Sequence, residues 1–199
     1  TQFKEKIIVP FPWGSKLSGI QDKAHIGWYK KSIIVNKGWE NKKTFIVIGA
    51  SDWETTVWID GDLLGSHKGG YVPFSFDITP HLKYGSLQEI IIRVNDNAGD
   101  PDKFKNGYAL YGKQGYGNAR GIWQTVYLEA RGEDFLDAIH FTPDIDNSKV
   151  KVTGYLDDYA SKEIPFSIKI KTGKKILKHN LFFKPGEIKN SFDIEIPEM

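Results

Sequence analysis

The chain has 199 residues and no cysteine, which excludes disulfides, zinc–thiolate sites and thiol nucleophiles and leaves the redox compartment open. Its 27 lysines and arginines nearly balance 25 aspartates and glutamates, a formal net charge of +2, so nucleic-acid binding has little electrostatic support. No apolar stretch approaches the roughly 20 residues of a membrane-spanning helix, and the N-terminal TQFKEK is not a signal peptide. We expect a soluble chain with neither nucleic acid nor membrane as a partner. Its compartment is unknown, with the periplasm or secretion open if a leader has been removed.

Short apolar or alternating segments recur along the chain, separated by Gly, Asn, Asp and Pro. The expected strands are residues 26–35, 43–48, 55–59, 63–67, 89–95, 122–130, 135–141, 149–156, 164–171, 175–183 and 188–196. Aromatic residues make up 14% of the chain, and they suit both strand packing and stacking on sugar rings. With no convincing helix among these segments, the pattern predicts an all-β protein.

The first motif is the loop PFPWGSKLSGI at residues 10–20, in which Trp13 stands between Pro12 and Gly14. We expect this tryptophan to be exposed. An exposed tryptophan in such a loop indicates either an interdomain contact or a platform for a sugar ring, and both interpretations stay open.

The segment TTVWIDGDLLGSH at residues 55–67 predicts a hairpin, because Asp60-Gly61 suits the positive φ values of a two-residue turn. Trp53 and Trp58 belong to this region and are expected to be packing residues. After the hairpin, SHKGGYVPFSFDIT at residues 66–79 could be a ligand loop or a corner of the β-structure. The double glycine and the alternation that follows it favour the corner. A helical turn is expected at residues 77–82, with Thr79 as its cap.

Two polar loops follow the strand expected to end at residue 95. In NDNAGDPDKFKNG, solvation and turn formation explain Asp96, Asp100 and Asp102. The segment GKQGYGNARG at 112–121 is rich in glycine, but it follows no clean strand and opens no helix, as a phosphate-binding loop would. It is either a plain surface loop or a carbohydrate contact. The side chains available for such a contact are Lys113, Gln114, Tyr116, Asn118 and Arg120.

The composition of the chain changes near residues 131–134. All six tryptophans lie before this point, and strands of roughly eight residues with polar turns follow it. We therefore expect two β-sandwich domains, residues 1–131 and 132–199. The second is expected to have five strands, fewer than the seven of an immunoglobulin-like sandwich, which indicates a C-terminally truncated domain.

No motif in the chain marks a reaction centre. The five histidines show no ligand spacing, no G-x-S-x-G is present, and no pair of carboxylates is marked by its context. These histidines are His25, His67, His81, His140 and His179. We expect no metal and no cofactor.

Five segments occur in an order that resembles a known family. They are IIVPFPWGSKLSGI, GWYKKSIIV, FIVIGASDWETTVWIDGDLLGSHKGGYVPFSFDIT, IIIRVNDN and the pair GKQ with GIWQTVYLEA. Residues 7–131 thereby resemble the N-terminal sugar-binding domain of family 2 glycoside hydrolases, which include β-galactosidases, β-glucuronidases and β-mannosidases. Residues 133–196 are similar in position to the immunoglobulin-like domain that follows in that family.

The resemblance implies a jelly-roll (galactose-binding-like) β-sandwich, a partial immunoglobulin-like sandwich, and then a (β/α)₈ barrel that carries two catalytic glutamates and works with retention. This chain shows no Asn-Glu pair and no βα repeats, so we expect no catalytic residue in it and no activity by itself. Members usually have an additional segment before the VPFPWGS stretch, which indicates an N-terminally truncated jelly roll.

The resemblance also implies that loops of the jelly roll help to shape the sugar pocket at the mouth of the barrel. The matching positions are 12–18 and 97–118, and GYGNAR stands where certain β-galactosidases place an acidic residue. The substrate-binding candidates are Trp13, Ser15, Asn97, Lys113, Gln114, Tyr116 and Asn118.

The leading hypothesis is the noncatalytic N-terminal region of a β-galactosidase-like enzyme. Its partners would be a β-glycoside, its own barrel and a second copy in a homo-oligomer. The alternatives are an autonomous carbohydrate-binding module and an interdomain scaffold.

Overall fold

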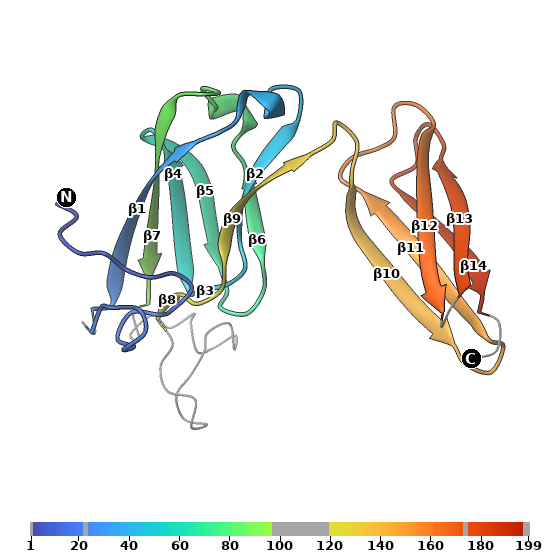
Figure 1. The fold of residues 1–199 in the computed structure, drawn as a ribbon, viewed down its shortest axis with the longest axis horizontal. Helices are drawn as coiled ribbons and strands as arrows, with labels where there is room; N and C mark the ends of the chain where they lie inside the picture. Colours follow the sequence, from blue (N-terminus) through green and yellow to red (C-terminus); the bar gives the residue numbers. More distant parts are fainter. Residues whose placement is uncertain (1, 22–23, 97–119, 173–174, 197–199) are drawn as a thin grey trace. The chain divides into compact units, whose positions relative to one another are not determined.

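The computed structural model of the chain describes residues 2–21, 24–96, 120–172 and 175–196 (Figure 1). The chain divides into two compact units, Thr1–Arg131 and Gly132–Met199. Every strand pairing in the described residues is antiparallel, and the described helices are two 3₁₀ turns of three residues each. The predicted all-β fold is confirmed. Neither described helix has the length or apolar character needed to span a membrane.

The first unit is a sandwich of two sheets, one in the strand order β1-β7-β4-β5 and the other in the order β6-β2-β9, with β3 and β8 forming a small pair at one end (Figure 1). Its elements are β1 (Ile26–Ile34), η1 (Lys37–Trp39), β2 (Lys43–Ile48), β3 (Ser51–Asp52), β4 (Glu54–Ile59), β5 (Asp62–Lys68), β6 (Phe74–Asp77), η2 (Thr79–His81), β7 (Leu87–Asn95), β8 (Gly121–Ile122) and β9 (Val126–Arg131).

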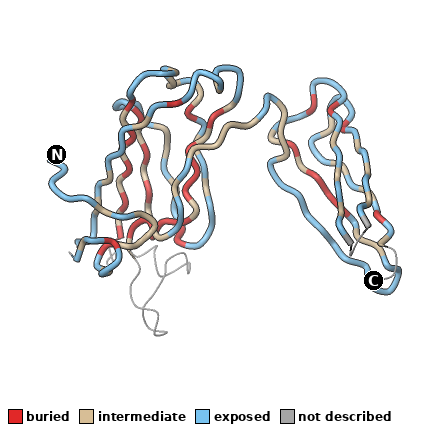
Figure 2. The backbone as a smooth tube through the Cα atoms, in the orientation of Figure 1, coloured by how far each residue is buried: buried red, intermediate tan, exposed pale blue. Residues whose placement is uncertain are grey.

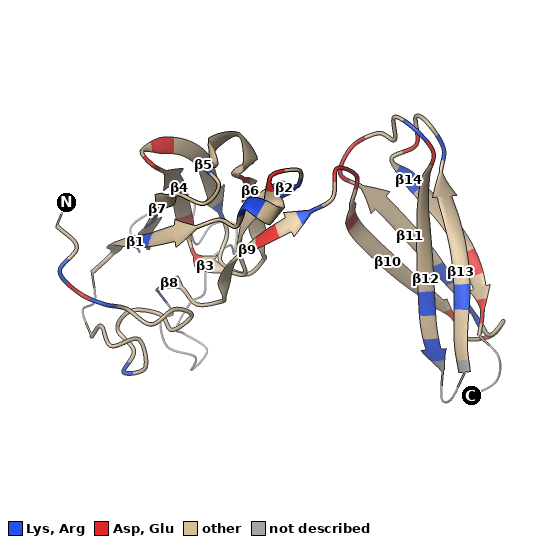
Figure 3. Ribbon diagram, turned by 45° about the horizontal axis from the view of Figure 1, so that its top comes forward, with Lys and Arg blue, Asp and Glu red and all other residues tan. Residues whose placement is uncertain are grey.

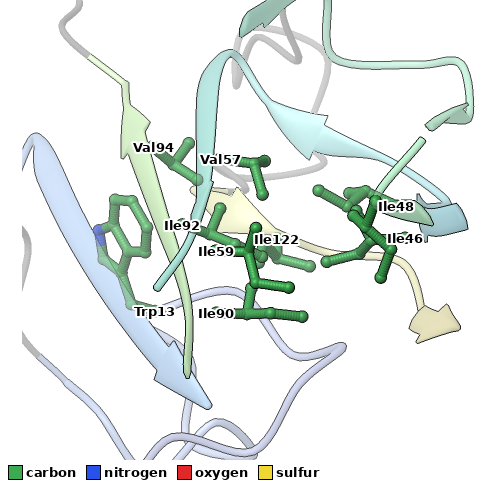
Figure 4. Close-up of a cluster of buried hydrophobic side chains, with 10 residues drawn as sticks. Trp13, Ile46, Ile48, Val57, Ile59, Ile90, Ile92, Val94 and Ile122 are labelled. Carbon is green, nitrogen blue, oxygen red and sulfur yellow. The ribbon is translucent and has the colours of Figure 1, made fainter. Parts of the chain in front are cut away.

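Alternation along the strands builds the core of this unit. On β4 and β7, every second residue is buried and the residues between them face outward (Figure 2). Side chains from β2, β4, β7 and β8 meet between the sheets (Figure 4). The labelled members are Trp13, Ile46, Ile48, Val57, Ile59, Ile90, Ile92, Val94 and Ile122. Trp13 is the one labelled member that comes from a loop rather than a strand.

The predicted hairpin turn is present between β4 and β5, with φ values of 48° at Asp60 and 93° at Gly61. The Asp60 carboxylate accepts hydrogen bonds from the Glu89 backbone N–H at 2.8 Å, Gln88 Nε2 at 3.0 Å and Lys83 Nζ at 3.1 Å. These bonds tie the turn to β7 and to the segment before it. The aspartate therefore anchors the turn as well as tolerating its backbone conformation.

Replacing Asp60 with asparagine should change how stability depends on pH. Hydrogen bonds from Glu89, Gln88 and Lys83 lower the pKa of Asp60 from 3.8 to about 2. A carboxyl with a lower pKa in the folded chain stabilises it above the unfolded pKa, and this contribution is lost as the pH falls from 3.8 towards 2. Asp60→Asn should be less stable than the parent at neutral pH, and the difference should shrink through this window. Urea-unfolding midpoints check this, and a difference that stays constant with pH would contradict it.

The segment at residues 66–79 forms a corner. β5 ends at Lys68 and β6 begins at Phe74, and between them the Gly69 N–H donates to the Trp53 carbonyl at 3.1 Å. The Trp123 indole N–H donates to the Gly70 carbonyl at 2.9 Å. The helical turn that follows is present as η2, but the predicted Thr79 cap is wrong. Helix η2 begins at Thr79 itself, whose N–H is bound by the Asp77 carboxylate at 2.8 Å.

The second unit has five described strands in two sheets, β10-β11-β14 and β12-β13. They are β10 (Leu136–Asp144), β11 (Lys149–Leu156), β12 (Ile164–Thr172), β13 (Lys175–Phe183) and β14 (Lys189–Glu195). On the outward face of this sheet, Lys169 of β12 lies opposite Lys178 of β13, and both side chains are exposed. Figure 3 shows bands of Lys and Arg along these two strands. The opposite face packs inward, where Phe166 contacts Phe183.

Part of the inner face of the second unit is uncovered. Phe141 of β10 lies opposite the fully buried Val152 of β11, so the two side chains share a face of the sheet. Yet Phe141 is 49% exposed, and Ile139 two residues before it is 42% exposed. Leu136 at the start of β10 packs against the buried cluster of this unit, whereas the described residues leave Ile139 and Phe141 partly exposed.

Candidate functional site

One end of the first unit gathers the loop at 10–21, the β3–β8 pair and the flanking residues Asp96 and Arg120 (Figure 1). Ser51 pairs with Ile122, and Asp52 with Gly121. The Asp96 N–H donates to the His25 carbonyl at 2.6 Å, which joins the end of β7 to the start of β1. We call this region the β3–β8 end.

Trp13 lies in a narrow slot at the β3–β8 end. Its side chain is 5% exposed, its indole N–H donates to the Ala24 carbonyl at 2.8 Å, and its ring centroid is 5.9 Å from that of Tyr29. A Cβ atom on Gly27 would lie 2.5 Å from the ring, and one on Gly121 would lie 2.0 Å from it. The expectation of an exposed tryptophan is therefore wrong, because two glycines allow the ring to enter the core. Its role in sugar binding stays a prediction.

An ion pair joins Asp96 at the end of β7 to Arg120 just before β8. Arg120 Nε lies 3.5 Å from Asp96 Oδ2, and the Asp96 side chain is 5% exposed. The interpretation of Asp96 as a solvated loop residue is therefore wrong. Since a buried carboxylate needs a charged or hydrogen-bonding partner, Arg120 neutralises Asp96, and the pair connects the end of β7 to the start of β8.

Tyr29 connects β1 to β8 in the same region. Its hydroxyl accepts a hydrogen bond from the Ile122 N–H at 3.2 Å, and burial raises its pKa well above the usual value. The phenol therefore stays protonated and acts as a neutral structural group.

Polar residues interrupt the apolar core at β3. Ser51, Asp52 and Thr55 are fully buried, and Trp53 is nearly so. The Ser51 hydroxyl, the Trp53 indole N–H and the Thr55 hydroxyl have no hydrogen-bond partner among the described residues. Since buried polar groups are normally paired, the β3–β8 end differs chemically from the aliphatic middle of the sandwich.

His67 and Lys68, the basic residues at the start of the corner, contact aromatic rings. The His67 ring stacks on Phe74 with centroids 4.0 Å apart, and burial lowers the pKa of the imidazole. Lys68 Nζ lies 5.3 Å from the Trp53 ring centroid. These contacts agree with a corner that packs the edges of the two sheets together.

A pocket of about 300 Å³ lies between the N-terminal segment and β1. Trp13 and Tyr29 contribute to its wall from the core side, and Ile26 and Trp28 contribute from the outer face of β1. Residues of the segment 2–7 form the remaining side. The pocket is large enough for a small ligand. The described residues contain no group of three or more His, Asp or Glu side chains that could hold a metal ion.

The family model described as "Glycosyl hydrolases family 2, sugar binding domain" matches residues 5–130. The chain belongs to this family. A β-galactosidase of Thermoanaerobacter pseudethanolicus is 28% identical over 183 residues, which cover 90% of this chain and 22% of the relative. A β-glucuronidase of Formosa agariphila is 32% identical over 117 residues, 58% of this chain and 11% of the relative.

Solved structures agree on the fold of the family 2 region. The β-D-glucuronidase of Dictyoglomus thermophilum has a TM-score of 0.68 at 19% identity, covering 96% of this chain and 34% of the other. A Bacteroides uniformis β-glucuronidase gives 0.65 at 21% identity, covering 94% and 24%. The chain thus spans about a tenth to a third of the length of these relatives. The predicted family and jelly-roll fold are confirmed, while the immunoglobulin-like assignment of the second unit stays a prediction, since the family model ends at residue 130.

Within this family 2 sugar-binding domain, two of the seven predicted contact residues can be placed. Trp13 is buried, and Ser15 is partly buried in a turn where its hydroxyl accepts from the Ser18 N–H at 3.3 Å. The other five candidates, Asn97, Lys113, Gln114, Tyr116 and Asn118, lie outside the described residues. The sequence did not predict that Asp52 is buried or that Asp96 pairs with Arg120, because no local pattern distinguishes a buried aspartate from a solvated one.

Proposed function

We propose that this chain is the noncatalytic N-terminal region of a retaining, β-galactosidase-like family 2 glycosidase. It buttresses a (β/α)₈ barrel outside this chain and lends loops to the sugar pocket. The family match over residues 5–130, with relatives several times longer than the matched region, carries the proposal. The choice of a galactoside rests on the T. pseudethanolicus β-galactosidase match, which covers 90% of this chain.

The contribution of this region is positional rather than chemical. The buried Trp13 ring fixes the loop at 10–21, and the Asp96–Arg120 pair connects β7 to β8 at the same end of the unit. Side chains on the loop at 10–21 can then meet a substrate with little loss of conformational entropy. The carboxyl groups that cleave the glycosidic bond belong to the barrel, and no reaction step is assigned to residues of this chain.

The proposal includes two domains, a jelly roll of residues 1–131 that lacks an N-terminal part and an immunoglobulin-like domain of residues 132–199 that lacks a C-terminal part. The partial exposure of Ile139 and Phe141 on β10 supports the proposal for the immunoglobulin-like domain, because a further strand beside β12 would cover both side chains. The proposal for the jelly roll is supported by β9, which is an edge strand whose core-facing Val126 and Leu128 are only partly buried.

Hydrolysis of 4-nitrophenyl β-D-galactopyranoside tests the function. The 199-residue chain should give no turnover, and a longer polypeptide that continues it into a barrel should cleave the substrate with retention. Limited proteolysis between β9 and β10 tests the domain boundary, since two resistant fragments are expected. Turnover by the isolated chain would contradict the noncatalytic assignment, and a longer polypeptide that prefers the matching β-glucuronide would overturn the choice of sugar.

A further inference from the structure

We infer that the pocket beside Trp28 binds a single pyranose ring in the isolated chain. This site goes beyond the proposed support of a barrel, because it needs no residue outside the described part of the first unit. Its volume of about 300 Å³ is at the lower end of the range of small-molecule pockets, roughly 300–1,000 Å³. One sugar ring suits this space better than an oligosaccharide does.

Trp28 provides a rigid apolar surface. It lies on the outward face of β1 with 43% of its surface exposed, and Ile26 is exposed on the same face. Its ring stacks on Trp58 of β4 with centroids 5.6 Å apart and an interplanar angle of 24°. Because Trp58 holds the indole in place, a ligand that packs against Trp28 loses little side-chain freedom of the protein. The C–H face of a pyranose ring matches such a surface.

The N-terminal segment supplies the polar side of the pocket. Gln2, Lys4 and Glu5 line it with an amide, an ammonium and a carboxylate, which together offer donors and acceptors to sugar hydroxyls. Phe3 lies between them, with its ring centroid 5.6 Å from Lys30 Nζ. Lys30 is itself paired with Glu89 of β7. These contacts hold the segment against β1, so that the polar groups and Trp28 face the same space.

The core side of the pocket contributes shape. The Trp13 indole N–H is already bonded to the Ala24 carbonyl, and the Tyr29 hydroxyl is bonded to the Ile122 N–H. The pocket therefore combines an exposed aromatic surface, that of Trp28, with the polar groups of Gln2, Lys4 and Glu5. This combination fits a sugar better than it fits a wholly apolar ligand or a phosphate.

Titration of the ¹⁵N-labelled chain with methyl β-D-galactopyranoside tests the site, and methyl β-D-glucuronide is a second probe. We expect millimolar binding of at least one glycoside, with the largest shift at the Trp28 indole N–H. Trp28→Ala should weaken this binding roughly tenfold or more, and Trp28→Phe should keep part of it. Trp39→Ala is the matched control, because Trp39 lies on η1 and does not line the pocket.

Two results would overturn the inference. One is the absence of binding by the folded chain with both glycosides, and the other is a Trp28→Ala variant that binds as the parent does. The Trp28→Phe variant controls for unfolding, because it keeps an aromatic ring stacked against Trp58. Binding here and turnover by a longer enzyme are separate measurements, so a failure of one is not a failure of the other.

Discussion

Replacing Trp13 with alanine should lower the free energy of unfolding by about 3–5 kcal/mol, the usual cost of truncating a buried aromatic residue. The side chain is 5% exposed, and the substitution also leaves the Ala24 carbonyl without its 2.8 Å indole hydrogen bond. Urea or guanidinium unfolding of the purified chain measures the change. Trp13→Phe should cost less, because a phenyl ring refills most of the slot between Gly27 and Gly121.

Trp39→Ala is the control for a partly exposed tryptophan in the same unit, and it should cost much less than Trp13→Ala. Equal costs for the two variants would contradict the buried position of Trp13. This prediction also affects any sugar-binding experiment on the loop at 10–21. A loss of binding in Trp13→Ala can arise from unfolding of the loop, so Trp13→Phe is the variant that tests a contact.

The sequence predicted the parts of the fold that depend on local pattern. Asp60-Gly61 determines a hairpin because two adjacent positive φ values are a local requirement. The short apolar or alternating segments at 55–59 and 89–95 likewise predicted strands, and these are present as β4 and β7. The strand expected at 122–130 is instead divided into β8 and β9. The N–H groups of Trp123 and Gln124 donate to the Ala50 carbonyl, a partner that no local pattern identifies.

The candidate site was harder to predict because its geometry is set by distant residues. Pro12-Trp13-Gly14 reads as an exposed loop, and the burial of its tryptophan depends on Gly27 and Gly121, which are far apart in the sequence. Asp96 stands among polar loop residues, yet its burial depends on Arg120 on the far side of the segment 97–119. In each case the residue that allows the burial is distant in the sequence, and the contact forms only in the folded sandwich.

Gly121→Ala should be the most disruptive small substitution at the β3–β8 end, with a loss of about 3–5 kcal/mol from overlap and backbone strain together. The added Cβ would lie 2.0 Å from the Trp13 ring and 2.2 Å from the Tyr29 hydroxyl oxygen, and Gly121 has a φ of +74°. Neither ring can move aside easily, because Trp13 is bonded to Ala24 and Tyr29 to Ile122. Equilibrium unfolding and the near-ultraviolet circular dichroism of the two rings measure the effect.

Gly61→Ala separates the two causes. Gly61 has a similar positive φ of +93°, but a Cβ there would meet nothing within 4 Å. It should therefore report backbone strain alone, about 1–2 kcal/mol, and the additional loss in Gly121→Ala is the cost of overlap with the slot. In a Trp13→Leu background that additional loss should decrease, since the two positions are in contact and their effects are coupled. If Gly121→Ala and Gly61→Ala cost the same, the slot around Trp13 is looser than the structure indicates, and the loop at 10–21 is not fixed by it.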